Sequence, residues 1–553
     1  MEGFESDDSN DGRESPVGGV KRTRKCASSG EDDYFPPTFN KVDKIGFGWD
    51  PSSERKKKKK KKNKKADREL SRMQAETQGL KKHKLGPKKA AKREHKKEAK
   101  EIELKDMTLP DCLRVLRNER PGSNAFMRVF VKIEKEFFGS NNQTVIVRVT
   151  DVDSKNLEKY FLHEHKVIVT SNAAALGYRG PPNFSFEKAK EIFQKSAKEL
   201  EVIDSRAGET VRLPIRHVLD HIENGIRDEN SPIFNVLSLE VSNDSQLAPL
   251  IEVPTFVKEQ SLVLDAERTL KSEARMDNWK KNVLSGEEMN ERRCREEKLA
   301  KFNQHIPRYE KYIIFSQAGA YTDLHIDLAG SGVFYYVHTG QKIIYFAEPT
   351  EENLKLYTQL EMQKKNLWSC DESILRRFQR IEVNAGEMVL IPPGFLHMVY
   401  TPIDSLVFGG NFLTETFLPL HFKMVVLEET CQKMKHLSKT QMFKEFDEFM
   451  FLYLEKNYLK LMLASEHSRN YPHLMARGRV LLENLEHRVR PGHIYNRYEK
   501  QDLLEELRNL LGMTKSQKIN EAMVGIEKMD YSIIKNIAPL PTVGYTRELQ
   551  LNI

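Results

Sequence analysis

Three side chains of metal-binding types lie in two separate segments of this chain. Residues 321–327 contain His325 and Asp327 in an H-x-D arrangement. Side chains two residues apart on a strand project from the same face, so these two can bind one ion. His397 follows the Pro-Pro-Gly turn of residues 391–400, which predicts a strand that returns beside the first pair. Two histidines and a carboxylate on one face form the facial triad of non-heme iron sites, but zinc accepts the same ligands.

The H-x-D pattern is weak evidence by itself, because a chain of this length contains about one such match by composition alone. A second pattern of this form, His221-Ile-Glu223, falls in a predicted helix, where a spacing of two separates the side chains. His338 lies beside Gly340, and we expect it at a surface turn. The first pair therefore depends on its neighbours for support.

Lys342 is the most informative of these neighbours. It lies among apolar residues in the predicted strand of residues 340–346, where an ammonium group is costly without an anionic partner. The distal carboxylate of 2-oxoglutarate is such a partner, and Thr322 and Tyr335 can add hydroxyl hydrogen bonds to it. The alternative is an edge lysine whose ammonium reaches water, which we would favour if the triad were absent.

Short β-strands must position these residues. Alternation and turn residues predict strands at 125–134, 144–150, 234–241, 312–316, 332–338, 342–347, 379–383, 388–391 and 406–411. Helical spacing is found at 186–200, at 211–226 with Pro214 in the first turn, and at 443–464. The resulting prediction is an α+β fold in which a jelly roll is flanked by helices.

Composition divides the chain into parts. Residues 51–100 carry 22 Lys and Arg against 6 Asp and Glu, so the net charge of +8 originates there and the rest is mildly acidic. We expect a disordered, lysine-rich tail at 1–104 that serves nuclear import or non-specific DNA contact, although a merely solvated tail is the simpler alternative. The other expected parts are 105–230, a catalytic barrel at 231–415 with a charged helical insertion at about 265–310, and a C-terminal helical domain at 416–553.

Cysteine usage and hydropathy limit the environment. The five cysteines are scattered and contain no C-x-x-C pair, which argues against disulfide frameworks and zinc fingers and favours a reducing, intracellular setting. We find no signal peptide and no apolar run long enough to span a bilayer, so no membrane association is expected.

Residues 321–330 resemble the signature of JmjC-domain histone lysine demethylases, in particular the F-box-type histone H3 lysine 36 demethylases and their PHD-finger relatives. Residues 231–240, 391–402 and 405–413 are similar to three further blocks of this family. The resemblance implies a cupin-like double-stranded β-helix. It also assigns Fe(II) to His325, Asp327 and His397, and 2-oxoglutarate to Thr322, Lys342, Tyr335 and Asn235.

The resemblance further implies that the protein uses dioxygen to remove methyl groups from histone H3, releasing formaldehyde and succinate. Mono- and dimethylated lysine 36 is the implied substrate, the H3 tail or nucleosome the implied partner, and the nucleus the implied location. The chain departs from the family in one run. Relatives have Gly-Gly-Thr-Ser-Val-Trp-Tyr-His where residues 329–336 read Ala-Gly-Ser-Gly-Val-Phe-Tyr-Tyr, so we expect Gly332 and the missing Trp to reshape the substrate channel. Zinc-binding reader modules of the family cannot be built from five scattered cysteines.

Two other functions stay open. A protein or RNA hydroxylase on the same barrel would also consume 2-oxoglutarate, but it would add one oxygen to its product and release no formaldehyde. A non-catalytic chromatin scaffold would keep the fold and bind DNA through the lysine run, although it would have no need of intact metal ligands.

Overall fold

A computed structural model of the chain describes residues 104–139, 144–150, 153–193, 199–225, 227–276, 286–433, 443–464 and 471–513. The chain divides into two units, Met1–Ala99 and Lys100–Ile553, and all described residues belong to the second. The predicted lysine-rich tail therefore lies outside the described residues, apart from its last position.

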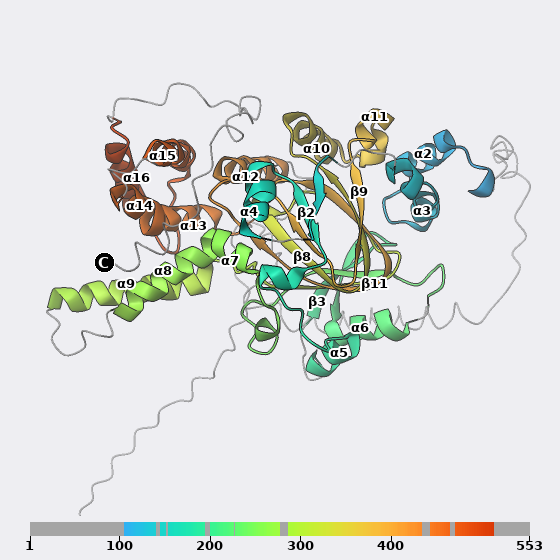
Figure 1. Ribbon diagram of the computed structural model, residues 1–553, viewed down its shortest axis with the longest axis horizontal. Coiled ribbons are helices and arrows are strands. Elements are labelled where there is room, and N and C mark those ends of the chain that lie inside the picture. Colours follow the sequence, from blue (N-terminus) through green and yellow to red (C-terminus); the bar gives the residue numbers. More distant parts are fainter. Residues whose placement is uncertain are drawn as a thin grey trace, which may run out of the picture. The chain divides into compact units, whose positions relative to one another are not determined.

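One mixed sheet of eleven strands forms the centre of the described unit (Figure 1). The strands are β1 (Ile146–Arg148), β2 (Val167–Thr170), β3 (Glu199–Asp204), β4 (Glu209–Pro214), β5 (Phe234–Glu240), β6 (Tyr312–Ser316), β7 (Tyr321–His325), β8 (Gly332–Ala347), β9 (Gln379–Asn384), β10 (Met388–Ile391) and β11 (Leu396–Phe412). Their order is β1-β2-β10-β8-β11-β6-β5-β3-β4, with β7 paired to β11 and β9 paired to β8. The β1–β2 pair is parallel, and the other recorded pairs are antiparallel.

The long strands β8 and β11 connect two halves of the sheet. The first half of β8 pairs with β10 and its second half with β9, while β11 pairs first with β7 and then with β6. Gly340 lies between the halves of β8 at φ +84°, and a Cβ there would lie 2.3 Å from the carbonyl oxygen of Asp404. This arrangement confirms the predicted jelly-roll-like α+β fold.

The two halves enclose an interior core of alternate strand residues. Val333, Val337, Ile344 and Phe346 are among its buried members. Tyr335 lies two positions from Val337, and Lys342 lies two positions from Ile344. Side chains two positions apart on a strand project from the same face, so both belong to the interior face. The predicted separate strands at 332–338 and 342–347 are one strand, and His338 lies within it, half-buried, instead of at a surface turn.

Helices surround the sheet. Those before and within the barrel are η1 (Leu104–Asp106), α2 (Leu109–Asn118), α3 (Asn124–Gly139), α4 (Ser154–Leu157), η2 (Glu158–His163), η3 (Ala173–Leu176), α5 (Phe186–Phe193), α6 (Ile215–Asn224), η4 (Ala248–Leu250), α7 (Thr255–Gln260), α8 (Leu262–Met276), α9 (Gly286–His305), η5 (Leu328–Gly330), α10 (Glu351–Gln363), η6 (Leu367–Ser369) and α11 (Glu372–Leu375). Those after it are α12 (Leu418–Lys433), α13 (Phe446–Tyr453), η7 (Leu454–Tyr458), α14 (Leu459–Ala464), α15 (Tyr471–Leu485), η8 (Glu486–Arg488) and α16 (Arg497–Leu510).

Several predicted elements need correction. Residues 125–134 form part of helix α3 and not a strand, because Phe126, Val129, Phe130 and Ile133 are buried at helical spacing. Of the helix expected at 186–200, residues 186–193 form α5 and residues 199–200 begin β3, while 194–198 lie outside the described residues. The helix expected at 211–226 is the end of β4 followed by α6, which begins directly after Pro214.

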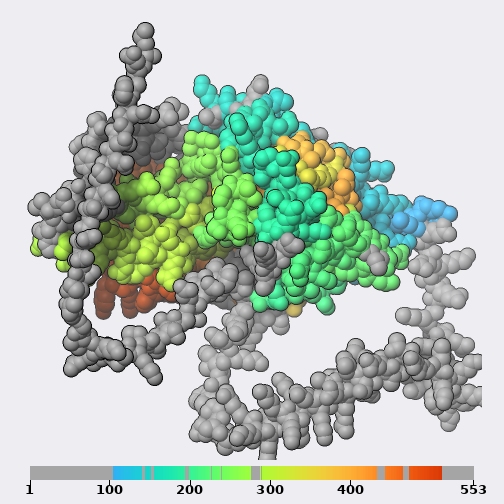
Figure 2. Space-filling model, turned by 90° about the horizontal axis from the view of Figure 1, so that it is seen from below, coloured from blue at the N-terminus to red at the C-terminus, as the bar shows by residue number. Residues whose placement is uncertain are grey.

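Helices α8 and α9 lie at about the residues where a charged helical insertion is expected. Helix α9 is largely exposed along its length, and Figure 2 shows the two helices in yellow-green on the surface of the face in view. The buried side of α8 packs with the C-terminal helices in an apolar core that also contains Leu328 and Ala329. No helix among the described residues combines the length and hydropathy that crossing a membrane requires.

Candidate metal centre

The structure brings His325, Asp327 and His397 together. His325 ends β7, and it pairs in register with His397 near the start of β11. Asp327 lies two residues beyond the end of β7 in an extended conformation, at φ −64° and ψ 156°. One ligand atom from each residue lies within 4.8 Å of the other two, and His397 Nε2 is 3.7 Å from Asp327 Oδ2.

Backbone contacts orient both imidazoles. His325 Nδ1 is 2.8 Å from the carbonyl oxygen of Asp323, and His397 Nδ1 is 3.1 Å from that of Phe395. A carbonyl accepts a hydrogen bond, so each Nδ1 carries the proton and each Nε2 keeps its lone pair. This tautomer is the one that a metal-binding histidine with a fixed ring requires.

The electrostatics of the triad also suit a cation. Burial lowers the pKa of His397 well below its ordinary value, and the neighbouring His325 lowers it further, so His397 is neutral. Burial raises the pKa of Asp327, which His325 and a hydrogen bond from the Asn411 side chain partly offset. A bound divalent cation would compensate the buried carboxylate, so the three residues fit a metal ion.

The residues assigned to 2-oxoglutarate lie on three strands, β5, β7 and β8. Asn235 on β5 donates from Nδ2 to Thr322 Oγ1 on β7 over 3.2 Å, and Ser316 on β6 donates to Asn235 Oδ1 over 2.7 Å. Tyr335 is buried on β8, and its burial and then the charge of Asp327 raise its pKa. Polar groups of several strands thus face the same interior as the metal triad.

Lys342 is 1% exposed, and its Nζ donates to Thr401 Oγ1 over 2.8 Å. Burial lowers its pKa to about 7. Within the described part of the chain, no carboxylate forms an ion pair with it. A buried ammonium that has only a hydroxyl partner is suited to an anionic ligand.

Sequence reasoning missed Thr401 and Asn411. Thr401 is four residues from His397 on the same strand, so even spacing could have placed both side chains on one face. Asn411 belongs to the same strand, β11, in register with Val333. Asn411 also donates to Ser331 Oγ over 2.9 Å, which fixes the amide beside Asp327.

The two alternative histidines lie elsewhere. His221 is on helix α6, as expected, and its Nε2 is 3.0 Å from the carbonyl oxygen of Pro232. His338 Nε2 is 2.8 Å from the carbonyl oxygen of Phe184. Neither belongs to the group of metal-binding side chains found among the described residues.

The altered run of residues 329–336 is closely packed. A Cβ on Gly332 would lie 3.0 Å from the ring of Phe412, which stacks on Phe161. Phe334, which stands where relatives have Trp, is fully buried in the core on the outer side of the sheet. Aromatic side chains fill the space beside these two positions, and their effect on the substrate channel stays a prediction.

Ala329 in this run has a left-handed backbone, with φ 49° and ψ 24°. The left-handed conformation destabilises an alanine by about 1–2 kcal/mol relative to glycine. Glycine loses ~0.5–1 kcal/mol more conformational entropy on folding, which partly offsets this difference. We therefore expect Ala329→Gly to raise the free energy of unfolding by roughly 0.5–1 kcal/mol in urea titrations. Ala347→Gly on strand β8 is the control and should lower it by a similar amount. Equal destabilisation by both changes would show that Ala329 is unstrained.

The fold is thus a jelly-roll-like sheet that brings two histidines and an aspartate together in a group able to hold a metal ion. Similarity to curated proteins indicates which family this chain resembles. The JmjC domain-containing histone demethylation protein 1 of Saccharomyces cerevisiae is 35% identical over 243 residues, covering 43% of this chain and 44% of the yeast protein. Lysine-specific demethylase 2A of Xenopus tropicalis is 29% identical over 287 residues, covering 51% and 23%. Histone lysine demethylase PHF8 of Danio rerio is 28% identical over 301 residues, covering 54% and 25%.

These matches confirm the resemblance to JmjC-domain histone lysine demethylases. The matched part is less than half of each of these relatives. No protein-family model matches the chain.

Proposed function

We propose that this chain is an Fe(II)- and 2-oxoglutarate-dependent histone lysine demethylase that acts on mono- and dimethylated lysine 36 of histone H3 in the nucleus. The observation that carries the proposal is the convergence of the His325, Asp327 and His397 ligand atoms within 4.8 Å inside a jelly-roll-like sheet. The names of the relatives support demethylation of histone lysines. A catalytic barrel over residues 231–415 and DNA contact through the lysine-rich tail are further parts of this proposal.

The side chains of the site have different proposed roles. His325, Asp327 and His397 would hold Fe(II) and leave three coordination positions open. Lys342, with Tyr335 and Thr322, would bind the distal carboxylate of 2-oxoglutarate, and Asn235 would fix the position of Thr322. Bound iron, 2-oxoglutarate and dioxygen would supply the oxidation that removes an N-methyl group as formaldehyde, with 2-oxoglutarate converted to succinate and carbon dioxide. The protein contributes binding, orientation and the exclusion of water.

Mass spectrometry of bulk histones tests the substrate. Incubation with the wild-type protein, iron and 2-oxoglutarate should convert dimethylated and monomethylated lysine 36 to the unmodified residue, while His325→Ala leaves both unchanged. A product heavier by one oxygen would instead identify a hydroxylase. Unaltered histones with both proteins would contradict demethylation.

Lys342 makes 2-oxoglutarate binding dependent on pH. Its pKa of about 7 means that the ammonium loses its proton as the pH rises above 7, whereas the bound dianion favours the protonated form. Binding then takes up a proton, and the Kd should rise by up to about tenfold per pH unit above pH 7. Calorimetry of the Co(II)-loaded protein without oxygen, in buffers of different ionisation enthalpy, measures this uptake. A wild-type Kd that is constant from pH 7 to 9 would refute the assignment.

A further inference from the structure

The turn that follows Asp327 needs support from outside itself. Ala329 and Gly330 have φ values of +49° and +56°, two consecutive residues in the left-handed region. Only glycine adopts this conformation without strain, so surrounding contacts must hold Ala329 in it. Because Asp327 immediately precedes the turn, the direction of its carboxylate depends on how firmly the turn is held.

Helix α12 supplies these contacts through two side chains. Glu428 Oε1 accepts a hydrogen bond from Ala329 N over 2.5 Å. The ring of His421 accepts at Nε2 from Thr414 N over 3.0 Å, so its Nδ1 carries the proton and donates to Ala329 O, also over 3.0 Å. Both peptide groups of Ala329 are thereby fixed by one helix.

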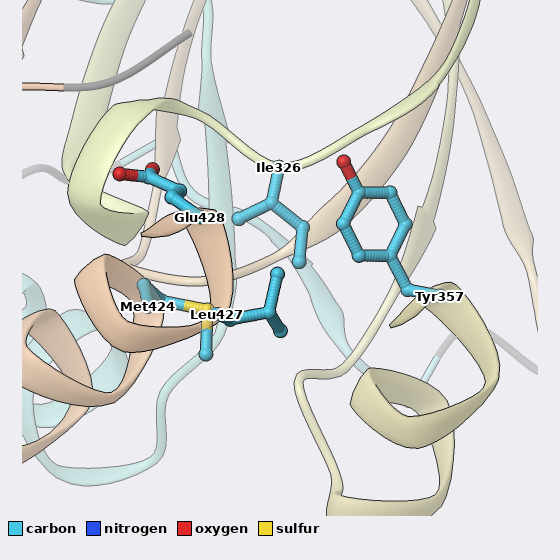
Figure 3. A pocket seen from close by; sticks show the side chains of 5 residues that line it. All are labelled: Ile326, Tyr357, Met424, Leu427 and Glu428. Carbon is cyan, nitrogen blue, oxygen red and sulfur yellow. The ribbon is translucent and has the colours of Figure 1, made fainter. Parts of the chain in front are cut away.

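Packing and burial show that the contact is close. A Cβ on Gly330 would lie 2.5 Å from Cγ of Met424, so α12 approaches the turn where a side chain is absent. Figure 3 shows the Glu428 side chain pointing from α12 into the curl of the turn beside Ile326, at the edge of a small cavity that Tyr357 also lines.

Burying the Glu428 carboxyl group costs desolvation free energy, which a purely structural contact does not require. Its residue is 5% exposed, and its Oε2 atom has no hydrogen-bond partner. Burial raises its pKa well above the ordinary value, and Ala329 N offsets this only in part. A buried acid without a cation beside it is retained at a cost, which points to a role at the neighbouring metal site.

We propose that Glu428 and His421 are positioning residues that hold the Asp327 carboxylate toward the metal, so that the C-terminal helical part of the chain sets metal affinity. The inference rests on the proposed metal site, but it goes beyond it because neither residue is a ligand. Hydrogen-bonded groups behind metal ligands change metal affinity without touching the ion.

Titration of the full-length protein with Co(II), followed by visible absorption, tests the proposal. Glu428→Ala and His421→Leu remove the bonds to Ala329 and should each weaken Co(II) binding about tenfold, whereas Glu428→Gln and His421→Asn retain an acceptor or a donor and should stay within about twofold of wild type. Glu429→Ala is the matched control. Glu429 is the next residue of α12, pairs with Arg488 at 2.8 Å, and should affect the melting temperature but not the Kd.

The outcomes separate the hypotheses. A wild-type protein that binds no Co(II) would contradict the proposed function itself. Wild-type binding with an unchanged Kd in Glu428→Ala would overturn the positioning role alone, even if the melting temperature falls. If Glu428→Ala does not fold, Glu428→Asp decides, because it keeps the carboxyl group but withdraws it by one methylene. A several-fold weaker Kd in that variant supports the proposal, and an unchanged Kd overturns it.

Discussion

His325→Ala is expected to weaken Co(II) binding at least about 100-fold and to abolish turnover. Structural sites with four protein ligands contribute roughly 10–16 kcal/mol of binding free energy, so loss of one ligand costs about 3 kcal/mol, or two orders of magnitude in Kd. His325 faces His397 across the strand pair, with ring centroids 4.1 Å apart. Among the described residues, no further histidine belongs to this cluster. Equilibrium titration and formaldehyde release measure the two effects.

His221→Gln is the matched control for this prediction. His221 belongs to the other H-x-acid pattern, and a glutamine amide can still donate to the carbonyl oxygen of Pro232. We expect metal affinity and turnover within experimental error of the wild type. Equal losses in both variants would mean that the metal site is not the triad.

Lys342→Met is expected to change stability and ligand affinity in opposite directions. The ammonium is buried, and its low pKa shows that burial disfavours the charged form. Because the pKa of Lys342 is lower in the folded chain than in the unfolded chain, the unfolded chain binds more protons between about pH 7 and 10. The free energy of unfolding of the ligand-free wild type should therefore increase as the pH rises through this range. Methionine removes the charge with little loss of volume, so the variant should be at least as stable as the wild type at pH 7, without this pH dependence.

The same change should nearly eliminate 2-oxoglutarate binding. Removing one partner of a buried ion pair costs about 3–5 kcal/mol, which corresponds to a Kd higher by about two to nearly four orders of magnitude. Thr401→Val serves as the control, because it removes only the hydroxyl that accepts from Lys342 and should cost about tenfold or less. A Lys342→Met variant that binds 2-oxoglutarate as the wild type does would exclude Lys342 from the keto-acid site.

Local patterns were sufficient where a short apolar run between turns forms a strand that is buried along its length. The strands at 312–316 and 388–391 coincide with β6 and β10, since each is a short apolar run bounded by turns. Residues 125–134 were mispredicted because Val129, Val131 and Ile133 recur at every second position, as in a strand, whereas burial in this segment follows helical spacing. The turn expected at Gly340 is a bend within β8, which long-range pairing with β11 keeps continuous.

In the candidate site, too, sequence patterns predicted some features and not others. The strand spacing of His325 and Asp327 and the turn before His397 predicted that the three side chains would converge. Their roles as metal ligands remain a prediction. The hydrogen bonds from α12 to Ala329 could not be predicted, because they join residues 99 and 92 positions apart in the sequence through tertiary packing alone. No local pattern distinguishes Glu428 from the many solvated acids of a charged helix.

The most direct test of the central claim is the joint release of formaldehyde and succinate from the purified protein. A histone H3 peptide dimethylated at lysine 36 is supplied with Fe(II), 2-oxoglutarate and dioxygen, and both products are quantified beside loss of the methyl groups. We predict formaldehyde and succinate in equal amounts with the wild type and neither with His325→Ala. Wild-type protein that binds metal and 2-oxoglutarate but releases no formaldehyde from any methylated histone peptide would contradict the demethylase assignment.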